Sequence, residues 1–200
     1  MEVCSIILGL LCVTCTDLAV LAGSYPEACY SKYQSVPIKG DACHEGALRI
    51  VLSFIDQVAS RHKKYIKPLL SVQVDFYLRV FIQVFSKASE SKLCATKQSY
   101  MFRCHNCFSF TESPVLNHIV KGNSQKFQTN FLLPENVDCS CCTGKMHLHG
   151  PLWNKSMHEN SFIASVIDFC KKEDVKLGTK DRIIGVLSVA KEVFFIILGN

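Results

Sequence analysis

Two short cysteine motifs contain the residues best suited to chemistry in this chain. Cys104 and Cys107 enclose two residues, and so do Cys139 and Cys142 further along the sequence. Two such motifs can place four thiolates around one ion, in the tetrahedral shell that Zn²⁺ prefers at structural sites. We therefore predict a structural zinc ion here, with neighbouring sulfurs about 3.5–4 Å apart.

Other assignments of these residues stay open from the sequence alone. Cys141, His105 and His147 are rival ligands, and the cysteines could instead be buried free thiols or form disulfides. The segments 99–103 and 145–149 flank the two motifs and have the pattern of strands. Together they predict a segment that resembles a zinc ribbon.

Cysteine usage also bears on the compartment. The chain has 12 cysteines, and an apolar run begins near its start. The only charge before that run is Glu2, where a secretion signal carries Lys or Arg. The run ends by Asp17, too early to span a membrane. We expect a protein that is not secreted and does not contact a membrane, with most thiols reduced.

Positive charge is concentrated in one part of the chain. Between His44 and Arg103 the sequence has ten Lys or Arg residues and four acidic ones. Such a concentration favours an anionic partner such as RNA, although a solvated basic face is the alternative. The cations that we predict to contact RNA are Arg49, Arg61, Lys63, Lys64 and Arg79.

The pattern of elements predicts an α/β fold. Residues 10–14 are apolar or β-branched at nearly every position, which is typical of an inner strand of a parallel sheet covered by helices on both faces. A helix over 41–64, capped by Asp41, follows. Alternating residues over 70–85 predict two strands, or one with a sharp bend near Asp75, and Asp75 could pair with Arg79.

The last part of the chain has fewer signals. Residues 150–153, Gly-Pro-Leu-Trp, predict a turn with an aromatic anchor at Trp153. Two helices are expected over 162–170 and 182–193, with Ser161 and Asp181 as N-caps.

Several of these segments resemble one family, the eukaryotic tRNA (guanine-26) dimethyltransferases. The resembling residues occur in order from about Leu10 to about Ser188. They comprise segments 10–23, 29–33, 42–45, 47–52, 68–72, 75–81 and 150–153, with both cysteine motifs. Members of this family use S-adenosylmethionine to methylate the exocyclic amine of a guanine in tRNA.

The resemblance implies a fold and a division of the chain. Residues 1–98 would be the C-terminal half of a Rossmann-like methyltransferase sheet, and 99–150 the zinc-ribbon-like segment. Residues 151–200 would begin an α/β C-terminal domain that binds tRNA. The polar end of the first strand, Thr14, Thr16 and Asp17, would form one wall of the pocket for a flipped guanine.

The family's cofactor and catalytic motifs lie upstream of the segment that this chain resembles. No residue here is therefore assigned to catalysis or to S-adenosylmethionine, and we expect the chain by itself to be inactive. Residues 1–8 and those beyond Phe194 differ from the family, as do Gln34 and Gly46, which predicts a form truncated at both ends.

The resemblance also implies a partner and a compartment. We expect a monomer that binds tRNA rather than DNA. The alternative to an enzyme is a zinc-containing module that binds tRNA without chemistry. The expected compartment is the nucleus or cytoplasm, with mitochondria possible for longer forms.

Overall fold

A three-stranded sheet forms the first half of the computed structural model, which describes residues 6–122, 124–129, 138–172 and 177–192. Its strands are β1 (Ile6–Cys15), β2 (Lys64–Val74) and β3 (Tyr77–Ser86), in the order β1-β3-β2. Both pairings are antiparallel, so β1 and β2 run parallel to each other with β3 between them. This corrects the prediction of an inner parallel strand, because β1 pairs in an antiparallel manner and its Leu10 is 57% exposed.

The alternating segment forms a tight hairpin, which confirms the predicted bend near Asp75. Val74 pairs with Tyr77 across a two-residue turn made of Asp75 and Phe76. The register of β2 shifts between Pro68 and Leu70, so Ile66 packs with Leu78, Val80 and Ile82 on one face of the sheet, whereas Leu70 packs with Phe81 on the other. The predicted pair of Asp75 with Arg79 is wrong, since the Asp75 carboxylate lies 2.7 Å from the Arg182 guanidinium.

One face of the sheet is covered by α3 (Cys43–Arg61), which follows the short helices α1 (Leu18–Leu21) and α2 (Pro26–Tyr33). The helix predicted over 41–64 is thus confirmed. Asp41 is not its cap, because Ala42 occupies the N-cap and the Asp41 carboxylate binds Arg103 instead. The helix packs its apolar stripe, with Leu48 and Leu52, on Leu78, Val80 and Ile82 of β3. All five side chains are buried, so this contact forms the main core.

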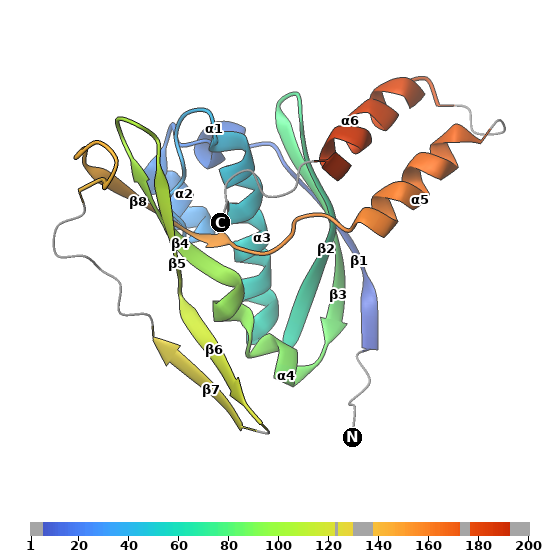
Figure 1. Cartoon of the computed structure of the whole chain (residues 1–200). Helices are drawn as coiled ribbons and strands as arrows, with labels where there is room; N and C mark the ends of the chain where they lie inside the picture. The colour runs from blue at the N-terminus through green and yellow to red at the C-terminus, as the bar shows by residue number, and fades with distance from the viewer. Residues whose placement is uncertain (1–5, 123, 130–137, 173–176, 193–200) are drawn as a thin grey trace.

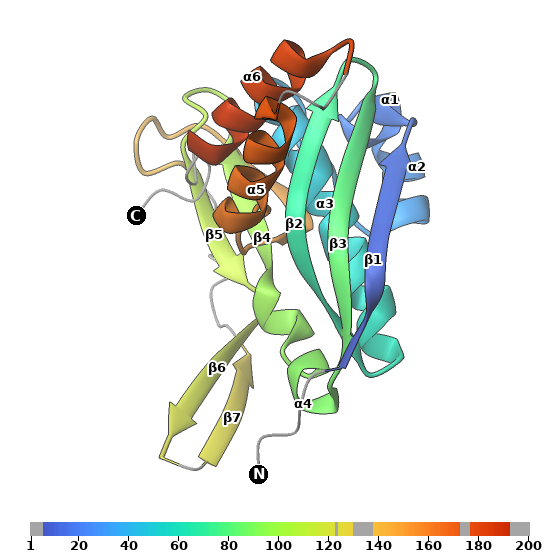
Figure 2. The same ribbon diagram turned by 90° about the vertical axis from the view of Figure 1, so that its right-hand side faces the viewer.

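On the other face, α5 (Asn160–Lys171) and α6 (Lys180–Glu192) pack along the side of the sheet formed by β2, as Figure 2 shows. Ile163 and Leu187 pack there with Leu70 of β2 and Phe81 of β3. Both helices were predicted, but their caps were not correctly placed. Glu159 precedes α5 at the N-cap position, and Ser161 and Asp181 lie inside the first turns.

A second sheet carries the cysteines. After α4 (Ala88–Ser91) and the 3₁₀ helix η1 (Cys94–Lys97) come β4 (Gln98–Cys104), β5 (Phe110–Pro114) and β8 (Met146–Trp153), in the order β5-β4-β8. The strands predicted over 99–103 and 145–149 are therefore present and paired with each other. The hairpin of β6 (Leu116–Lys121) and β7 (Ser124–Thr129) projects away from this sheet (Figure 1).

Residues 150–153 belong to β8 and do not form the predicted turn. Gly150 has φ +111°, and a Cβ at this position would lie 2.9 Å from the Ser99 carbonyl oxygen. Only glycine therefore fits where β8 approaches β4 so closely. Trp153 is 2% exposed, which confirms it as an aromatic anchor.

Arg49 joins the two sheets. Its side chain, on α3, is buried, and Nη2 lies 2.8 Å from the Glu45 carboxylate. Its Nη1 donates to the carbonyl oxygen of Trp153 at 2.7 Å, at the end of β8. A buried guanidinium with both a carboxylate and a carbonyl partner fixes the distance between the helix and the second sheet.

We predict that Arg49→Ala lowers the free energy of unfolding by about 3 kcal/mol, because it leaves Glu45 and the Trp153 carbonyl without their buried partner. Arg61→Ala is the matched control, since Arg61 is an exposed arginine at the end of the same helix. It should change stability by less than about 0.5 kcal/mol. Urea denaturation followed by Trp153 fluorescence measures both variants, and equal effects would contradict the role given to Arg49.

Candidate metal centre and the polar edge of the sheet

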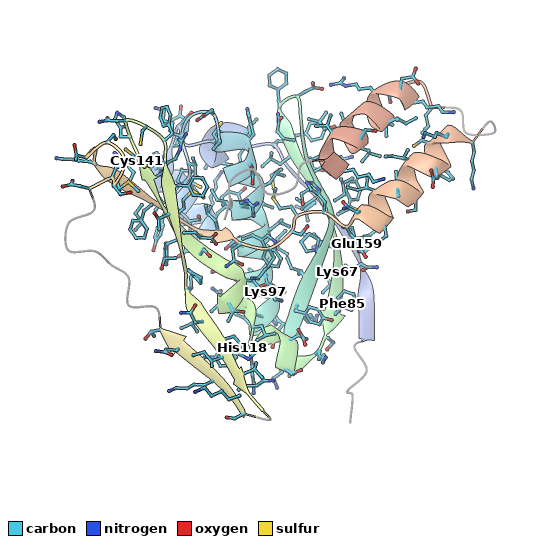
Figure 3. All side chains as sticks on the ribbon, in the orientation of Figure 1. Lys67, Phe85, Lys97, His118, Cys141 and Glu159 are labelled. Atoms are coloured by element: carbon cyan, nitrogen blue, oxygen red, sulfur yellow. The ribbon has the colours of Figure 1, made fainter. Side chains whose placement is uncertain are left out.

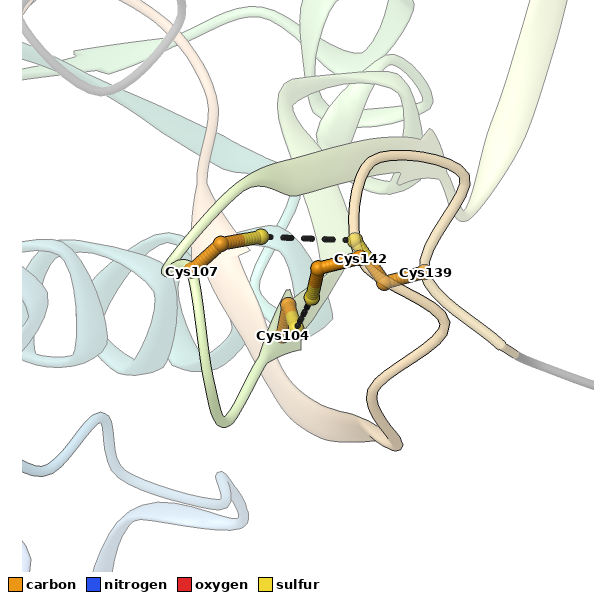
Figure 4. A group of neighbouring side chains, drawn as sticks. All are labelled: Cys104, Cys107, Cys139 and Cys142. Atoms are coloured by element: carbon orange, nitrogen blue, oxygen red, sulfur yellow. Dashed lines mark hydrogen bonds between the residues drawn. The ribbon is translucent and has the colours of Figure 1, made fainter.

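The four predicted cysteines come together at one end of the second sheet (Figure 4). Their sulfur atoms all lie within 4.8 Å of one another. Cys104 Sγ is 3.5 Å from Cys142 Sγ, and Cys107 Sγ is 3.4 Å from Cys139 Sγ. Tetrahedral zinc with Zn–S bonds of about 2.3 Å needs sulfurs about 3.8 Å apart. The cluster therefore has the donors and the spacing to hold a metal ion.

The backbone around the cluster is folded to support thiolates. The amide nitrogens of Asn106 and Cys141 each lie 3.4 Å from the sulfur two residues earlier, Cys104 and Cys139 respectively. These amides can donate to thiolate sulfur and stabilise its charge. Gly144 closes the second loop, and a Cβ there would lie 3.0 Å from Cys104 Sγ.

Ser109 adds a hydroxyl to the site. Its Oγ lies 3.0 Å from Cys139 Sγ and 3.2 Å from Cys107 Sγ. Hydrogen bonding from Ser109 lowers the pKa of both thiols, that of Cys139 to about 6. The Gly144 amide lowers the pKa of Cys142, but the neighbouring thiols Cys107 and Cys104 outweigh it and raise this pKa to about 12.

The rival ligands lie outside this group of four. Figure 3 labels Cys141, which lies on the tip of the second loop and is exposed. The rings of His105 and His147 are 5.5 Å apart and pack against each other, and both residues are exposed. In the described part of the chain, the only group of residues arranged to hold a metal is thus the four-cysteine cluster.

The polar end of β1 is the second place where predicted residues meet. Thr14 Oγ1 accepts a hydrogen bond from Arg79 Nε at 3.0 Å, across the β1–β3 pairing. Thr16 is exposed, whereas Asp17 is half-buried and its carboxylate contacts two side chains of α2. The Asp17 carboxylate accepts from the Tyr33 hydroxyl at 2.9 Å and pairs with Lys32 at 3.2 Å. Asp17 therefore ties the end of β1 to α2.

The cations predicted to contact RNA do not share one surface. Arg61 and Lys63 are exposed where α3 ends, and Lys64 begins β2. Arg79 is exposed beside Thr14. Arg49 is 3% exposed and bound to Glu45 and Trp153, so we remove it from the set of RNA contacts.

A cavity of about 390 Å³ lies between β2 and the loop that leads to α5. Figure 3 labels four of its lining residues. Lys67 and Glu159 form an ion pair of 2.8 Å at its edge. Phe85 stacks on Tyr65, and the Lys97 ammonium lies over the other aromatic wall, Trp153. The Lys67–Glu159 pair thus neutralises two of the charges that line the cavity, and aromatic rings face the Lys97 ammonium.

Sequence reasoning missed three residues of these two sites. Ser109 and Gly144 were not predicted, although each lies two residues beyond a predicted ligand. Tyr33 belongs to a segment that carries the family resemblance, and its partner Asp17 is sixteen residues away in the chain. Nothing in its local sequence indicates that contact.

Comparison with known proteins identifies the family of this chain. A sequence model described as N2,N2-dimethylguanosine tRNA methyltransferase matches residues 3–196. The chain belongs to this family. The match extends beyond 10–188 at both ends, so residues 3–9 and 189–196 fit the family better than the motifs alone predicted.

Among curated relatives, the tRNA (guanine(26)-N(2))-dimethyltransferase of Drosophila melanogaster is 43% identical over 192 residues, covering 92% of this chain and 33% of that protein. The human enzyme of the same name is 40% identical over 186 residues, with 92% and 28% covered. This chain thus spans about a third of the length of such relatives. The structure of Trm1 from Pyrococcus horikoshii with S-adenosyl-L-methionine has a similar fold, with a TM-score of 0.71, 23% identity, and 92% and 42% covered.

We predict that replacing any one of the four clustered cysteines by serine abolishes tight metal binding and disorders the loops that carry them, because metal binding supplies folding free energy to such sites. Cys141→Ser is the matched control, since Cys141 is the exposed cysteine between two of the ligands. Metal content of the purified chain and the absorption of its cobalt form measure the effect. A Cys141→Ser protein that lost its metal, beside a Cys107→Ser protein that kept it, would contradict this ligand set.

Proposed function

We propose that this chain is part of a tRNA methyltransferase that uses S-adenosylmethionine to methylate the exocyclic amine of guanine-26 in tRNA. The observation that carries the proposal is the family match over residues 3–196. Relatives named tRNA (guanine(26)-N(2))-dimethyltransferase at about 40% identity over 92% of the chain support it. The alternative is a zinc-containing tRNA-binding module without chemistry.

The arrangement of the first sheet supports the C-terminal half of a Rossmann-like methyltransferase sheet. β1 and β2 are parallel strands joined by α3, which is the crossover unit from which such sheets are built. Thr14 and Thr16 lie at the carboxyl end of β1, where ligands bind in α/β sheets. We propose that they line one wall of the guanine pocket, and that Asp17 positions this edge through Tyr33 and Lys32.

We propose that the four-cysteine cluster binds zinc in a structural role within a zinc-ribbon-like segment over 99–150. The soft sulfur donors and their spacing favour zinc over hard cations. Bound zinc would supply folding free energy to the two loops. All four ligands come from the protein, so the cluster offers no position at which a substrate would react.

The division into 1–98, 99–150 and 151–200 also remains a proposal, although α5 and α6 of the last segment pack on the first sheet. We also propose that the protein is a monomer and that it lies in the nucleus or cytoplasm. In the described residues, no helix combines the length and apolar character needed to cross a membrane. One relative, from Saccharomyces cerevisiae, carries the word mitochondrial in its name.

Transfer of the methyl group needs residues that bind the cofactor and align the guanine amine. No residue of this chain has been assigned to either role. A guanine amine is a poor nucleophile, so acceptors must hold its hydrogens and align it with the methyl group. We predict that the 200-residue chain, given S-adenosyl-[methyl-³H]methionine and unmodified tRNA, transfers no label. Stoichiometric labelling would show that the active site lies within these residues.

We predict that Lys63→Glu with Lys64→Glu weakens tRNA binding and lowers the slope of log K against log salt by about 0.9 for each phosphate that the protein no longer neutralises. Both lysines lie where α3 ends and β2 begins. The matched control is Lys171→Glu with Lys172→Glu, two exposed lysines at the end of α5 on the other face of the sheet. Fluorescence anisotropy with labelled tRNA over a salt series measures both. If only the control variant weakened tRNA binding, the tRNA surface would instead lie on the face that carries α5.

A further inference from the structure

A cavity of about 320 Å³ lies directly beside the four-cysteine cluster, and Cys104 forms part of its wall. Its other functional lining residues are basic, imidazole or aromatic side chains, and no Asp or Glu is among the described residues that line it. They are Lys39, Arg103, His105, Phe108, His147 and His149. Such a lining is suited to an anion that carries an aromatic group.

Arg103 lines this cavity and is held in place by two partners. Its Nη1 donates to the Lys39 carbonyl at 2.9 Å, and its Nη2 lies 2.6 Å from the Asp41 carboxylate. The guanidinium carbon lies 4.6 Å from the centre of the Phe108 ring. The Asp41 side chain is 78% exposed, so it offsets part of the Arg103 charge from outside the cavity.

The imidazoles add further hydrogen-bonding groups. His105 and His147 are exposed, with their rings 5.5 Å apart. His149 Nδ1 lies 2.8 Å from the Pro37 carbonyl oxygen, so this nitrogen carries the proton and donates. Burial lowers the pKa of His149, which keeps its ring neutral near pH 7.

Phe108 offers a surface for stacking. It is 53% exposed and has φ +62°, so the loop presents a large apolar ring to solvent beside an arginine. Proteins bind single-stranded nucleic acid with this combination, in which a base stacks on an aromatic ring and cations contact the adjacent phosphate.

We propose that this cavity binds one phosphate of the tRNA backbone through Lys39, Arg103 and His147, with a neighbouring unpaired base on Phe108. This inference rests on the proposed function and adds a contact site to it. It would also link metal binding to RNA binding, because His105 and Phe108 lie on the first ligand loop and His147 lies at the start of β8, which follows the second. The competing explanation is that the basic residues only offset the negative charge of a metal bound by four thiolates.

The test measures binding of fluorescently labelled, unmodified tRNA to the metal-loaded 200-residue chain over a salt series. Lys39→Ala and His147→Ala should each weaken binding about fivefold, and Phe108→Ala about tenfold. Lys39→Ala should also lower the salt slope by about 0.9. Asp41→Asn should instead strengthen binding about threefold, because Arg103 loses its counter-ion.

Lys92→Ala is the matched control. Lys92 is an exposed lysine at the end of α4, which Figures 1 and 2 place at the opposite end of the molecule from the cysteine loops. It should leave affinity within about twofold of the unmodified chain. Metal content and circular dichroism are recorded for each variant. The opposite directions expected for Lys39→Ala and Asp41→Asn are not explained by loss of folding.

The outcomes separate the two proposals. If the unmodified chain binds no tRNA, the tRNA proposal fails and this site fails with it. If the chain binds tRNA but the cavity variants bind as Lys92→Ala does, only this site is overturned. If the variants lose metal in parallel with affinity, the residues serve the cluster and the phosphate site is also overturned.

Discussion

The buried guanidinium of Arg49 is the interaction on which the relative position of the two sheets depends. It lies on α3, whose apolar stripe packs on the first sheet, and it reaches the carbonyl of Trp153 at the end of β8. Glu45, one helical turn earlier, neutralises it. Because an unpaired buried charge is costly, α3 and β8 can separate only at a large energetic penalty. The cysteine cluster at the far end of β4 and β8 is thereby placed relative to the sheet that carries Thr14 and Arg79.

The two candidate sites use different physical means to stay ordered. The polar edge of the first sheet relies on hydrogen bonds between segments, such as those from Tyr33 to Asp17 and from Arg79 to Thr14. The cysteine loops have little apolar core of their own, and four converging sulfurs are their main shared contact. A bound metal would therefore order the loops far more than their packing does.

Chain topology explains why the basic residues differ in burial and in the contacts that they make. Arg49 and Arg61 lie on one helix, twelve residues apart, yet one is buried and the other exposed. Arg49 reaches the end of β8, whereas Arg61 lies in the last turn of the helix. In the sequence Arg103 is only one member of a basic region, but contacts with Asp41 and Phe108 hold it in the wall of a cavity.

The sequence by itself indicated several elements and a set of candidate metal ligands. Spacing pointed to Cys104, Cys107, Cys139 and Cys142, because a metal site needs short, local motifs, but it left Cys141, His105 and His147 open until the structure brought the four together. Periodicity predicted α3 and the bend near Asp75. Only the tertiary structure decided the partners. The antiparallel pairing of β1, the burial of Arg49, the Asp41–Arg103 pair and the Asp17–Tyr33 bond all join residues distant in the chain. Local patterns record which face of an element is apolar, but not which distant group meets it.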